Sequence, residues 1–492
     1  MNQIVKPNTM LECSHFFAGE FVKGRGAEFK IDSPYYGEVV GIAHEATQGE
    51  LDAAVEKAHL AQKNWSKTPI KERSAVLFKV REILLRDCER IAQTISLENG
   101  KTIGESKAGI LKGVEVLEYA LSLQNHDRGG KLEVSREVFC EYRRIPLGVV
   151  ACITPFNFPA MVPMWTLPIA LALGNAVLWK PSEKTPLTSN LIAQVFQEAG
   201  LAAGLFNVLQ GSAPLVEKIC AHPNIKAVSF VGSTKVAKIV YEKCALTGKR
   251  VLALGGAKNH IFLLPDAQID LCGVGIADSF TGCAGQRCMA ASVLLAVGNV
   301  DAHIEKIVER AKSMELGSNM GAIISKEQVQ FLHSAIDRAE KNGAKIILDG
   351  RKCKPPLEYS HGYWLGPTIL DQVNPEWESA KSELFGPIIS IIRVKNISEG
   401  LKIENANEYG NACSVFTSSG ANAEEIIRHA NAGMVGINIG VPVPREPFSF
   451  GGIHMSKFGH GDITGDGSLD FWTDQKKVTF KWHMQSDHNW MS

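Results

Sequence analysis

The chain has 492 residues, and because one domain usually takes ~150 residues, two or three packed units are expected. Hydrophobic residues (45%) and charged residues (21%) are at ordinary globular levels, and 52 basic against 52 acidic side chains leave no net field for nucleic acid or an anionic membrane. The eleven cysteines are odd in number and form no Cys-x-x-Cys pair, which indicates neither a disulfide framework nor a metal site. Small-molecule chemistry in a reducing compartment is favoured.

Two hydrophobic regions bear on location. Residues 1–24 contain charges and Pro7 but lack the continuous apolar core of a signal peptide, so we expect a cytoplasmic protein. The most hydrophobic stretch, residues 149–179, is interrupted by prolines, a glycine and asparagines that would break a spanning helix of ~20 residues. We interpret it as buried core beside a site.

The first predicted elements are two amphipathic helices, at residues 51–62 and 71–86, where apolar side chains recur at helical spacing. From Gly148, β-like runs alternate with helical patterns, as in βαβ units of ~30 residues. The runs lie at 148–154, 176–180, 205–210, 227–231 and 251–254. They predict a parallel sheet covered by helices, one of them capped by Thr188 and ended by Gly200.

A second α/β domain is predicted after Lys258. A Pro-Asp turn at 265–266, a helical stretch and the loop around Cys288 precede a β-like run at 292–297. Further βα units follow to about residue 440. The chain ends in a β-like run at 477–482, a strand able to pair with another subunit.

Cys288 is the candidate nucleophile. It lies in a loop with two glycines, residues 282–290, that leads directly into the run at 292–297. Arg287 beside it and the loop amides would favour the thiolate. The alternative is a buried structural thiol, which is the interpretation for the other ten cysteines.

Asn157 is the candidate oxyanion donor. It stands between two aromatic residues and two prolines in the Pro-Phe-Asn-Phe-Pro motif at 155–159, which would hold its side chain stiffly. Such a donor is worth ~3 kcal/mol in a transition state. The alternative is an asparagine that merely satisfies turn backbone groups.

Two further motifs follow β-like runs. The run at 228–231 leads through Gly-Ser-Thr into a helical pattern, whose N-terminal amides suit a pyrophosphate. Without a Gly-x-Gly-x-x-Gly fingerprint, Ser233 and Thr234 taken alone are more often an ordinary helix cap. Lys180 and Glu183 end another run, at the sheet edge where α/β proteins bind ligands, and suit the hydroxyls of a ribose. The alternative there is a solvated loop.

Together these motifs resemble the aldehyde dehydrogenase superfamily, from about residue 15 to the end. The ordered set is Pro-Phe-Asn-Phe-Pro at 155–159, Lys-Pro-Ser-Glu at 180–183, Phe-Val-Gly-Ser-Thr at 230–234, Gly-Gln-Arg-Cys at 285–288 and Glu-Leu-Phe-Gly-Pro at 383–387. The resemblance implies an α/β fold with two Rossmann-like parallel-sheet domains and a small β oligomerisation element. It implies an NAD-binding domain at 1–124 and 145–255, a catalytic domain at 256–465, an oligomerisation element at 125–144 and 466–492, and a homotetramer.

The resemblance also implies roles for single residues. Cys288 would attack an aldehyde, Asn157 and the Cys288 backbone amide would hold the oxyanion, and hydride would leave to NAD to give a thioester. Lys180 and Glu183 would bind the adenosine ribose, and Glu183 favours NAD because its carboxylate would repel a 2′-phosphate. The expected cofactor contacts are Thr154, Phe156, Lys180, Glu183, Lys184, Ser233, Gly255 and Glu383.

One departure indicates a branch of the superfamily. No glutamate lies between Glu242 and Glu305, and Ala253 stands where the hydrolytic branch has its water-activating glutamate. The Gly-Ala-Lys-Asn-His sequence at 256–260 resembles the methylmalonate-semialdehyde dehydrogenases, which pass their acyl group to coenzyme A. Without a general base a thioester outlives attack by water, and a thiol is the better nucleophile. We expect oxidation of malonate or methylmalonate semialdehyde, with decarboxylation to acetyl-CoA or propionyl-CoA.

The substrate carboxylate is expected at Arg287 and Lys112. The acylating branch usually has arginine in the place of Lys112, and lysine keeps the charge but loses the bidentate fork. Arg445 is an alternative replacement, although a surface charge is the favoured interpretation. A hydrolytic dehydrogenase that releases a free acid, with a base such as Glu446, is the main rival. A cofactor-free cysteine hydrolase and a noncatalytic binding protein are disfavoured by the complete motif set.

Overall fold

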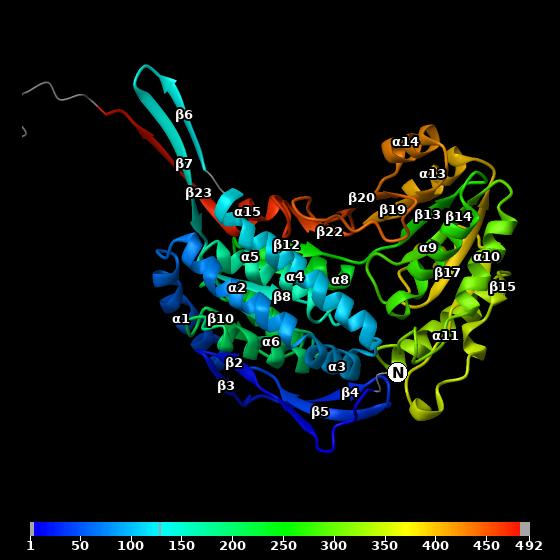
Figure 1. Cartoon of the computed structure of the whole chain (residues 1–492), viewed down its shortest axis with the longest axis horizontal. Coiled ribbons are helices and arrows are strands. Elements are labelled where there is room, and N and C mark those ends of the chain that lie inside the picture. Colours follow the sequence, from blue (N-terminus) through cyan, green and yellow to red (C-terminus); the bar gives the residue numbers. More distant parts are fainter. Residues whose placement is uncertain (1–3, 127–128, 483–492) are drawn as a thin grey trace, which may run out of the picture.

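The computed structural model describes residues 4–126 and 129–482. Two large sheets, each covered by helices, form the two halves of the molecule, and a narrow three-stranded sheet extends from the first half as an arm (Figure 1). The predicted class is confirmed: the chain has a mixed α/β fold with two parallel sheets and a small antiparallel one.

The first sheet has eight strands in the order β22-β12-β11-β8-β9-β10-β2-β3. Its five parallel strands are β8 (Val149–Ile153), β9 (Ala176–Lys180), β10 (Phe206–Val208), β11 (Ile225–Val231) and β12 (Arg250–Leu254). The antiparallel edges are β22 (Lys457–Gly459), β2 (His15–Phe17) and β3 (Glu20–Val22). Because β8 lies between β9 and β11, the chain winds outward in both directions from it, which leaves a crevice at the carboxyl ends.

Within the described residues, the helices from α1 to α8 cover the first sheet. They are α1 (Gln48–Trp65), α2 (Ile70–Arg86), α3 (Cys88–Asn99), α4 (Ile103–His126), α5 (Met161–Ala172), α6 (Leu187–Glu198), α7 (Ala213–Ala221) and α8 (Thr234–Leu246). All residues of α5 except Met161 are buried, although the helix contains Pro168, so the hydrophobic stretch is core as predicted. In the described part of the chain, no helix has the length and hydrophobicity needed to cross a bilayer.

The predicted strands and the first two helices are confirmed within a few residues, but the cap at Thr188 is wrong. Thr188 lies inside α6, and Pro186 occupies the N-cap position. The buried carboxylate of Glu98 instead accepts the amide hydrogens of Leu187 (2.7 Å) and Thr188 (2.8 Å). A side chain from a distant helix thus satisfies the first amides of α6 in place of a local cap.

The second sheet has seven strands in the order β15-β16-β17-β14-β13-β19-β20, and only β15 is antiparallel. The strands are β13 (Asn259–Leu263), β14 (Ala291–Val297), β15 (Lys345–Leu348), β16 (Thr368–Asp371), β17 (Ile388–Val394), β19 (Ala412–Phe416) and β20 (Met434–Ile437). Its helices are α9 (Ile269–Thr281), α10 (Asp301–Lys312), α11 (Lys326–Lys341), α12 (Glu378–Lys381), α13 (Ile397–Asn405) and α14 (Gly420–His429). The second predicted α/β unit is therefore present.

The arm joins β6 (Gly130–Ser135), β7 (Val138–Pro146) and β23 (Thr473–Phe480). The C-terminal strand β23 pairs antiparallel with β7 from Thr473 opposite Pro146 to Phe480 opposite Phe139. In Figure 1 the red and cyan strands run side by side away from the body. The predicted terminal strand is thus paired within its own chain, and its role in assembly stays a prediction.

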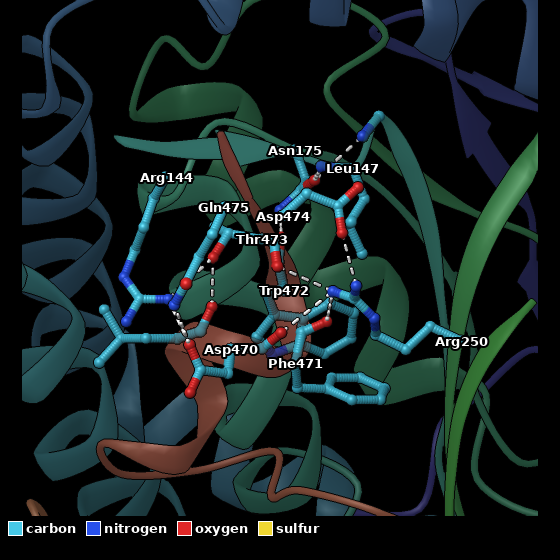
Figure 2. Close-up of polar contacts among 12 residues, drawn as sticks. Arg144, Leu147, Asn175, Arg250, Asp470, Phe471, Trp472, Thr473, Asp474 and Gln475 are labelled. Carbon is cyan, nitrogen blue, oxygen red and sulfur yellow. Dashed lines mark hydrogen bonds and ion pairs between the residues drawn. The ribbon is translucent and has the colours of Figure 1, made fainter. Parts of the chain in front are cut away.

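A polar joint fixes the base of the arm to the first sheet (Figure 2). Arg250, at the start of β12, donates through Nη1 to the carbonyl oxygens of Asp470 (3.0 Å), Phe471 (3.0 Å) and Thr473 (2.9 Å). Asn175 donates to the carbonyl oxygen of Trp472 at 3.0 Å. These bonds hold the short helix α15 (Gly467–Trp472) and the first residue of β23.

Several short strands were not predicted. They are β1 (Leu11–Cys13), β4 (Glu28–Ser33), β5 (Glu38–His44), β18 (Tyr409–Gly410) and β21 (Ile453–His454), besides β2, β3 and β22. Most have two or three residues, too few to show alternation. One of them departs from a predicted domain boundary, since β22 lies within 256–465 but pairs with β12 of the first sheet. The other boundaries stay predictions.

Candidate active site

A cavity of about 430 Å³ lies at the carboxyl ends of β8, β9, β11 and β12, where the first sheet faces the loops of the second. Its walls bring together most of the predicted site residues: Thr154, Phe156, Asn157, Lys180, Glu183, Ser233, Gly255, Cys288 and Glu383. The other lining residues are mainly apolar, and no individual role was predicted for them: Ile153, Pro155, Val162, Ser182, Ala213, Val216, Phe230, Val231, Gly232, Val236, Gly256 and Phe385. A candidate nucleophile and candidate cofactor ligands therefore share one space.

Lys180 and Glu183 form an ion pair at the end of β9. The Lys180 ammonium is buried and donates from Nζ to Glu183 Oε2 at 3.0 Å. Burial pushes the pKa of Glu183 upward, but the Lys180 charge and hydrogen bonds outweigh it and hold that pKa below its usual value. The charged carboxylate can accept two hydroxyl hydrogens, which fits a ribose.

The turn from β11 into α8 fits a phosphate group. Ser233 occupies the N-cap position of α8, yet its side chain makes no capping hydrogen bond. Thr234 Oγ1 instead accepts from the Gly256 amide at 2.8 Å. The Ser233 hydroxyl and the first amides of α8 are thus left for a ligand, which favours the phosphate interpretation over an ordinary cap.

Glycines 255 and 256 form the floor of this region because no side chain would fit there. A Cβ atom on Gly255 would stand 2.8 Å from Thr234 Oγ1, and one on Gly256 would stand 2.3 Å from Glu383 Oε2. The backbone can therefore approach both Thr234 and Glu383 closely. The residues present fit a dinucleotide laid across the crevice.

Glu383 places a second carboxyl group in the cavity. Its Oε1 accepts from the Ala257 amide at 2.9 Å. Burial raises the pKa of Glu383 to about 7, although the Ala257 amide and the Lys258 charge oppose the rise. Lys258 itself is buried, which lowers the pKa of its ammonium to about 7.

Three other predicted cofactor positions differ in their surroundings. The Phe156 ring meets that of Phe385 edge-on, with centroids 5.8 Å apart. Thr154 Oγ1 accepts from Trp179 Nε1 at 2.8 Å. Lys184 is exposed, is not among the described residues that line the cavity, and its Nζ lies 5.8 Å from the centre of the Phe156 ring.

Cys288 is half-buried at the cavity wall, in the loop between α9 and β14. Its carbonyl oxygen accepts from the side-chain amides of Asn259 (2.8 Å) and Asn411 (2.9 Å). Burial and then the Glu383 charge raise the pKa of the thiol to about 12, against the smaller effects of a backbone amide, Arg287 and Lys101. In this arrangement the thiol is protonated at neutral pH.

The Cys288 loop is tightly constrained. Cys283 and Ala284 have φ of 54° and 52°, a region that residues with side chains seldom occupy. Gly285 has φ of 68°, and a Cβ atom there would stand 2.1 Å from the carbonyl oxygen of Gly386. The loop is therefore held in place by positive-φ backbone and by close contact with Gly386.

Asn157 lies beside this loop. It is buried, and its Nδ2 donates to the carbonyl oxygen of Gln286 at 3.1 Å, two residues before Cys288. A side-chain amide nitrogen carries two hydrogens, so one remains for an oxyanion. The contact is consistent with the predicted role, which stays a prediction.

The predicted substrate ligands do not meet in the cavity. The Arg287 Nη2 donates to the carbonyl oxygens of Asp278 and Ser279 (3.1 Å) near the end of α9. Lys112 on α4 donates to Glu115 Oε2 at 2.7 Å. Neither side chain is among the described residues that line the cavity, and Arg445 is exposed.

No water-activating glutamate occupies the position of Ala253. This residue is fully buried in β12, and its methyl group offers no base. The rival base Glu446 is not among the lining residues, and one of its oxygens is buried without a hydrogen-bond partner in the described structure. Glu183 and Glu383 are the carboxylates of the cavity wall. Within residues 4–126 and 129–482, no cluster of three His, Cys, Asp or Glu suits a metal ion.

Comparison with known proteins agrees with this geometry. The sequence profile of the aldehyde dehydrogenase family matches residues 21–478. Malonate-semialdehyde dehydrogenase 1 of Geobacillus thermodenitrificans is 38% identical over 477 residues, which cover 95% of this chain and 98% of the relative. A crystal structure of a putative methylmalonate-semialdehyde dehydrogenase from Sinorhizobium meliloti complexed with NAD superimposes with a TM-score of 0.95 at 38% identity, over 97% of this chain and 99% of that one. Methylmalonate-semialdehyde dehydrogenase from Oceanimonas doudoroffii gives a TM-score of 0.95 at 35% identity, over 97% and 99% of the two chains.

Proposed function

The chain belongs to the aldehyde dehydrogenase family, and we propose that it oxidises malonate or methylmalonate semialdehyde with NAD and passes the acyl group to coenzyme A. Decarboxylation would give acetyl-CoA or propionyl-CoA. Support comes from relatives named for these substrates at 35–38% identity over nearly the whole chain. Further support comes from a cavity that holds a thiol beside dinucleotide-fitting groups.

Each step of the proposed reaction uses residues of the cavity. Cys288 loses its thiol proton to solvent, as the proton that the overall oxidation releases, and the resulting thiolate attacks the aldehyde carbon. The carbonyl oxygen becomes an oxyanion held by the Asn157 amide and the Cys288 backbone amide. NAD, when bound, would supply the hydride acceptor, and loss of hydride from the adduct would leave a thioester on Cys288. Lys180, Glu183, Ser233 and Glu383 line the same cavity and would hold the cofactor there.

We propose coenzyme A as the acyl acceptor mainly because residue 253 is an alanine, whose side chain is a methyl group. With no carboxylate at this position, water near the thioester lacks the base that hydrolytic relatives would supply. A thiol attacks a thioester faster than water does, so coenzyme A becomes the acceptor. The substrate carboxylate is assigned to Arg287 and Lys112, which requires both side chains to leave their present partners.

Steady-state NADH formation tests the proposal. Each semialdehyde is supplied with NAD, with and without coenzyme A, and the acyl product is identified by mass. We expect multiple turnovers only with coenzyme A, and no activity from Cys288→Ser, which should still bind NAD in calorimetry. Equal turnover without coenzyme A, with release of free acid, would contradict the assignment.

Hydrolysis to a free carboxylic acid is the second candidate, and one observation favours it. The Glu383 carboxyl group lines the same cavity as Cys288, and its pKa of about 7 suits a general base. If Glu383 were the general base that activates water, Glu383→Gln would lower the yield of free acid more than it lowers the NADH burst of a single turnover. A burst and a free-acid yield that fall together would assign Glu383 to cofactor binding instead.

A further inference from the structure

A short segment, residues 99–105, runs from the last residue of α3 to the first turn of α4 and contacts the loop that carries the proposed oxyanion donor. Asn99 Nδ2 donates to the carbonyl oxygen of Phe156 at 2.7 Å. Lys101 Nζ donates to the carbonyl oxygen of Asn157 at 2.5 Å. Two consecutive peptide groups of the 155–159 motif are therefore fixed by side chains of this segment.

The same segment also contacts the loop of the nucleophile. The backbone N–H of Cys283 donates to Glu105 Oε1 at 2.5 Å. The carbonyl oxygen of Gly100 accepts from the Ala322 amide at 2.7 Å, and Ala322 in turn accepts from Gln286 Nε2 at 3.2 Å. Residues 99–105 thus tie the backbone of Asn157 to the chain just before Cys288.

Lys101 is an unusual residue for a purely structural tie. It is 4% exposed, and its ammonium lies 4.1 Å from the centre of the Phe158 ring. Within the described chain no carboxylate forms an ion pair with it. Burying a charge without a counter-charge is costly, so a neutral residue would be the better choice for stability alone. Its charge also opposes the rise that burial causes in the pKa of Cys288.

We propose that Lys101 is a positioning residue for the oxyanion site. It acts through the backbone of Asn157, and with Glu105 on the other loop it sets the separation between the Asn157 amide and Cys288. The inference rests on the proposed roles of those two residues. Because Lys101 is not among the described residues that line the cavity, its removal should change the chemical step and leave NAD binding almost unaltered.

Lys101→Met tests the inference, because methionine has a similar length but neither donor nor charge. Removing an oxyanion donor itself costs about 10²- to 10³-fold in rate, so misplacing it should lower the NADH burst rate about 10- to 100-fold. NAD affinity and the number of NAD-binding sites are measured by calorimetry, and the burst is normalised to that number of sites, which corrects for unfolded protein. Lys107→Met is the matched control, since Lys107 on α4 pairs with Glu89 on α3 at the surface and its loss should leave the burst unchanged. A wild-type burst rate in Lys101→Met would overturn the inference.

A double-mutant cycle separates positioning from a general structural role. If Lys101 acts through Asn157, then Lys101→Met should lower the burst rate less than threefold when it is introduced into Asn157→Ala. An equal loss of burst rate in the wild-type and the Asn157→Ala proteins would overturn the inference. Asn99→Ala provides the second variant if Lys101→Met does not fold, because it breaks the neighbouring bond without disturbing a charge. It should lower the burst several-fold, again only while Asn157 is present.

Failure of the inference can be distinguished from failure of the proposed function. If Cys288→Ser were still active, Cys288 would not be the nucleophile, and both the proposed function and the positioning role would be refuted. An inactive Cys288→Ser together with an unaffected Lys101→Met would refute only the positioning role.

Discussion

Charge inside the cavity controls when Cys288 becomes a nucleophile. Its pKa of about 12 has burial as the main cause and the Glu383 carboxylate as the second. Since both groups would be negative together, ionising Glu383 disfavours the thiolate. A bound cofactor or substrate that changed the position of Glu383 would therefore alter the reactivity of the thiol.

Glu383→Gln should make the cofactor-free thiol more reactive. The pKa of Glu383 is about 7, so above that pH the wild-type residue is charged and the variant is not. Removing one nearby like charge lowers a thiol pKa by about half a unit to one unit, so iodoacetamide alkylation at pH 8.5 should be ~3- to 10-fold faster. Glu376→Gln, on an exposed carboxylate paired with Lys381, should alkylate at the wild-type rate. A slower Glu383→Gln would mean that the carboxylate assists the thiolate.

Local motifs in the sequence predict which residues gather at the cavity, and the roles of those residues stay predictions. Asn157 and the Lys180–Glu183 pair stand in motifs that follow strands, and Cys288 stands in a motif that precedes one. The fold brings these motifs to one cavity. Lys101, Asn259 and Asn411 were missed, since each acts on a loop distant in sequence and Lys101 and Asn411 belong to no recognised motif. The partners of Arg287 and Lys112 depend on side-chain packing that a linear pattern does not contain.

At the scale of the elements, the joint at Arg250 holds the C-terminal strand. Its guanidinium bonds to three backbone carbonyls and pairs with Asp474 at 2.6 Å (Figure 2). Hydrogen bonds from charged donors are worth about 1.5–3 kcal/mol each, and loss of this set leaves carbonyls without partners. The stability of β23 therefore depends on a residue more than 200 positions away.

Arg250→Met should loosen β23 without unfolding the first sheet. We expect amide hydrogen exchange in residues 473–480 to accelerate about tenfold or more, while exchange in β8 and β9 is unchanged. Arg143→Met is the control on the paired strand, because Arg143 is largely exposed and bonds only to Glu141 in the described structure. Uniform acceleration across both sheets would show that the joint stabilises the whole domain instead.

Long elements followed from periodicity, and short ones did not. The buried parallel strands β8 and β9 and the helices α1 and α2 have clear patterns, and all are present within a few residues of their predicted bounds. Strands of two or three residues such as β1, β18 and β21 depend on partners far along the chain. The α6 cap was mispredicted for the same reason, since Glu98 of α3 supplies it.

In the whole molecule, the arm has an exposed surface that is not explained if the protein is a monomer. Its outer strand β6 is exposed from Lys131 to Ser135, including Leu132 (68% exposed) and Val134 (51%). An open strand edge with apolar side chains is a site for pairing with another chain. We therefore keep the homotetramer as a proposal, with the arm as its contact.

Sedimentation tests this assembly. The wild-type protein should sediment as a tetramer, and Leu132→Glu with Val134→Glu should shift it to smaller species, because two carboxylates cannot be buried without partners. Leu357→Glu changes a residue that is 95% exposed on a loop of the catalytic half and should leave the mass unaltered. A monomeric wild-type protein would contradict the proposal.

The most direct test of the account is the intact mass of the enzyme after reaction with NAD and semialdehyde in the absence of coenzyme A. We expect one NADH per site and an acyl adduct on Cys288 that persists until coenzyme A is added, because Ala253 leaves water without a base. The mass of the adduct would also show whether carbon dioxide has left before transfer. Continued NADH formation with an unmodified Cys288 and free acid in solution would contradict the central claim.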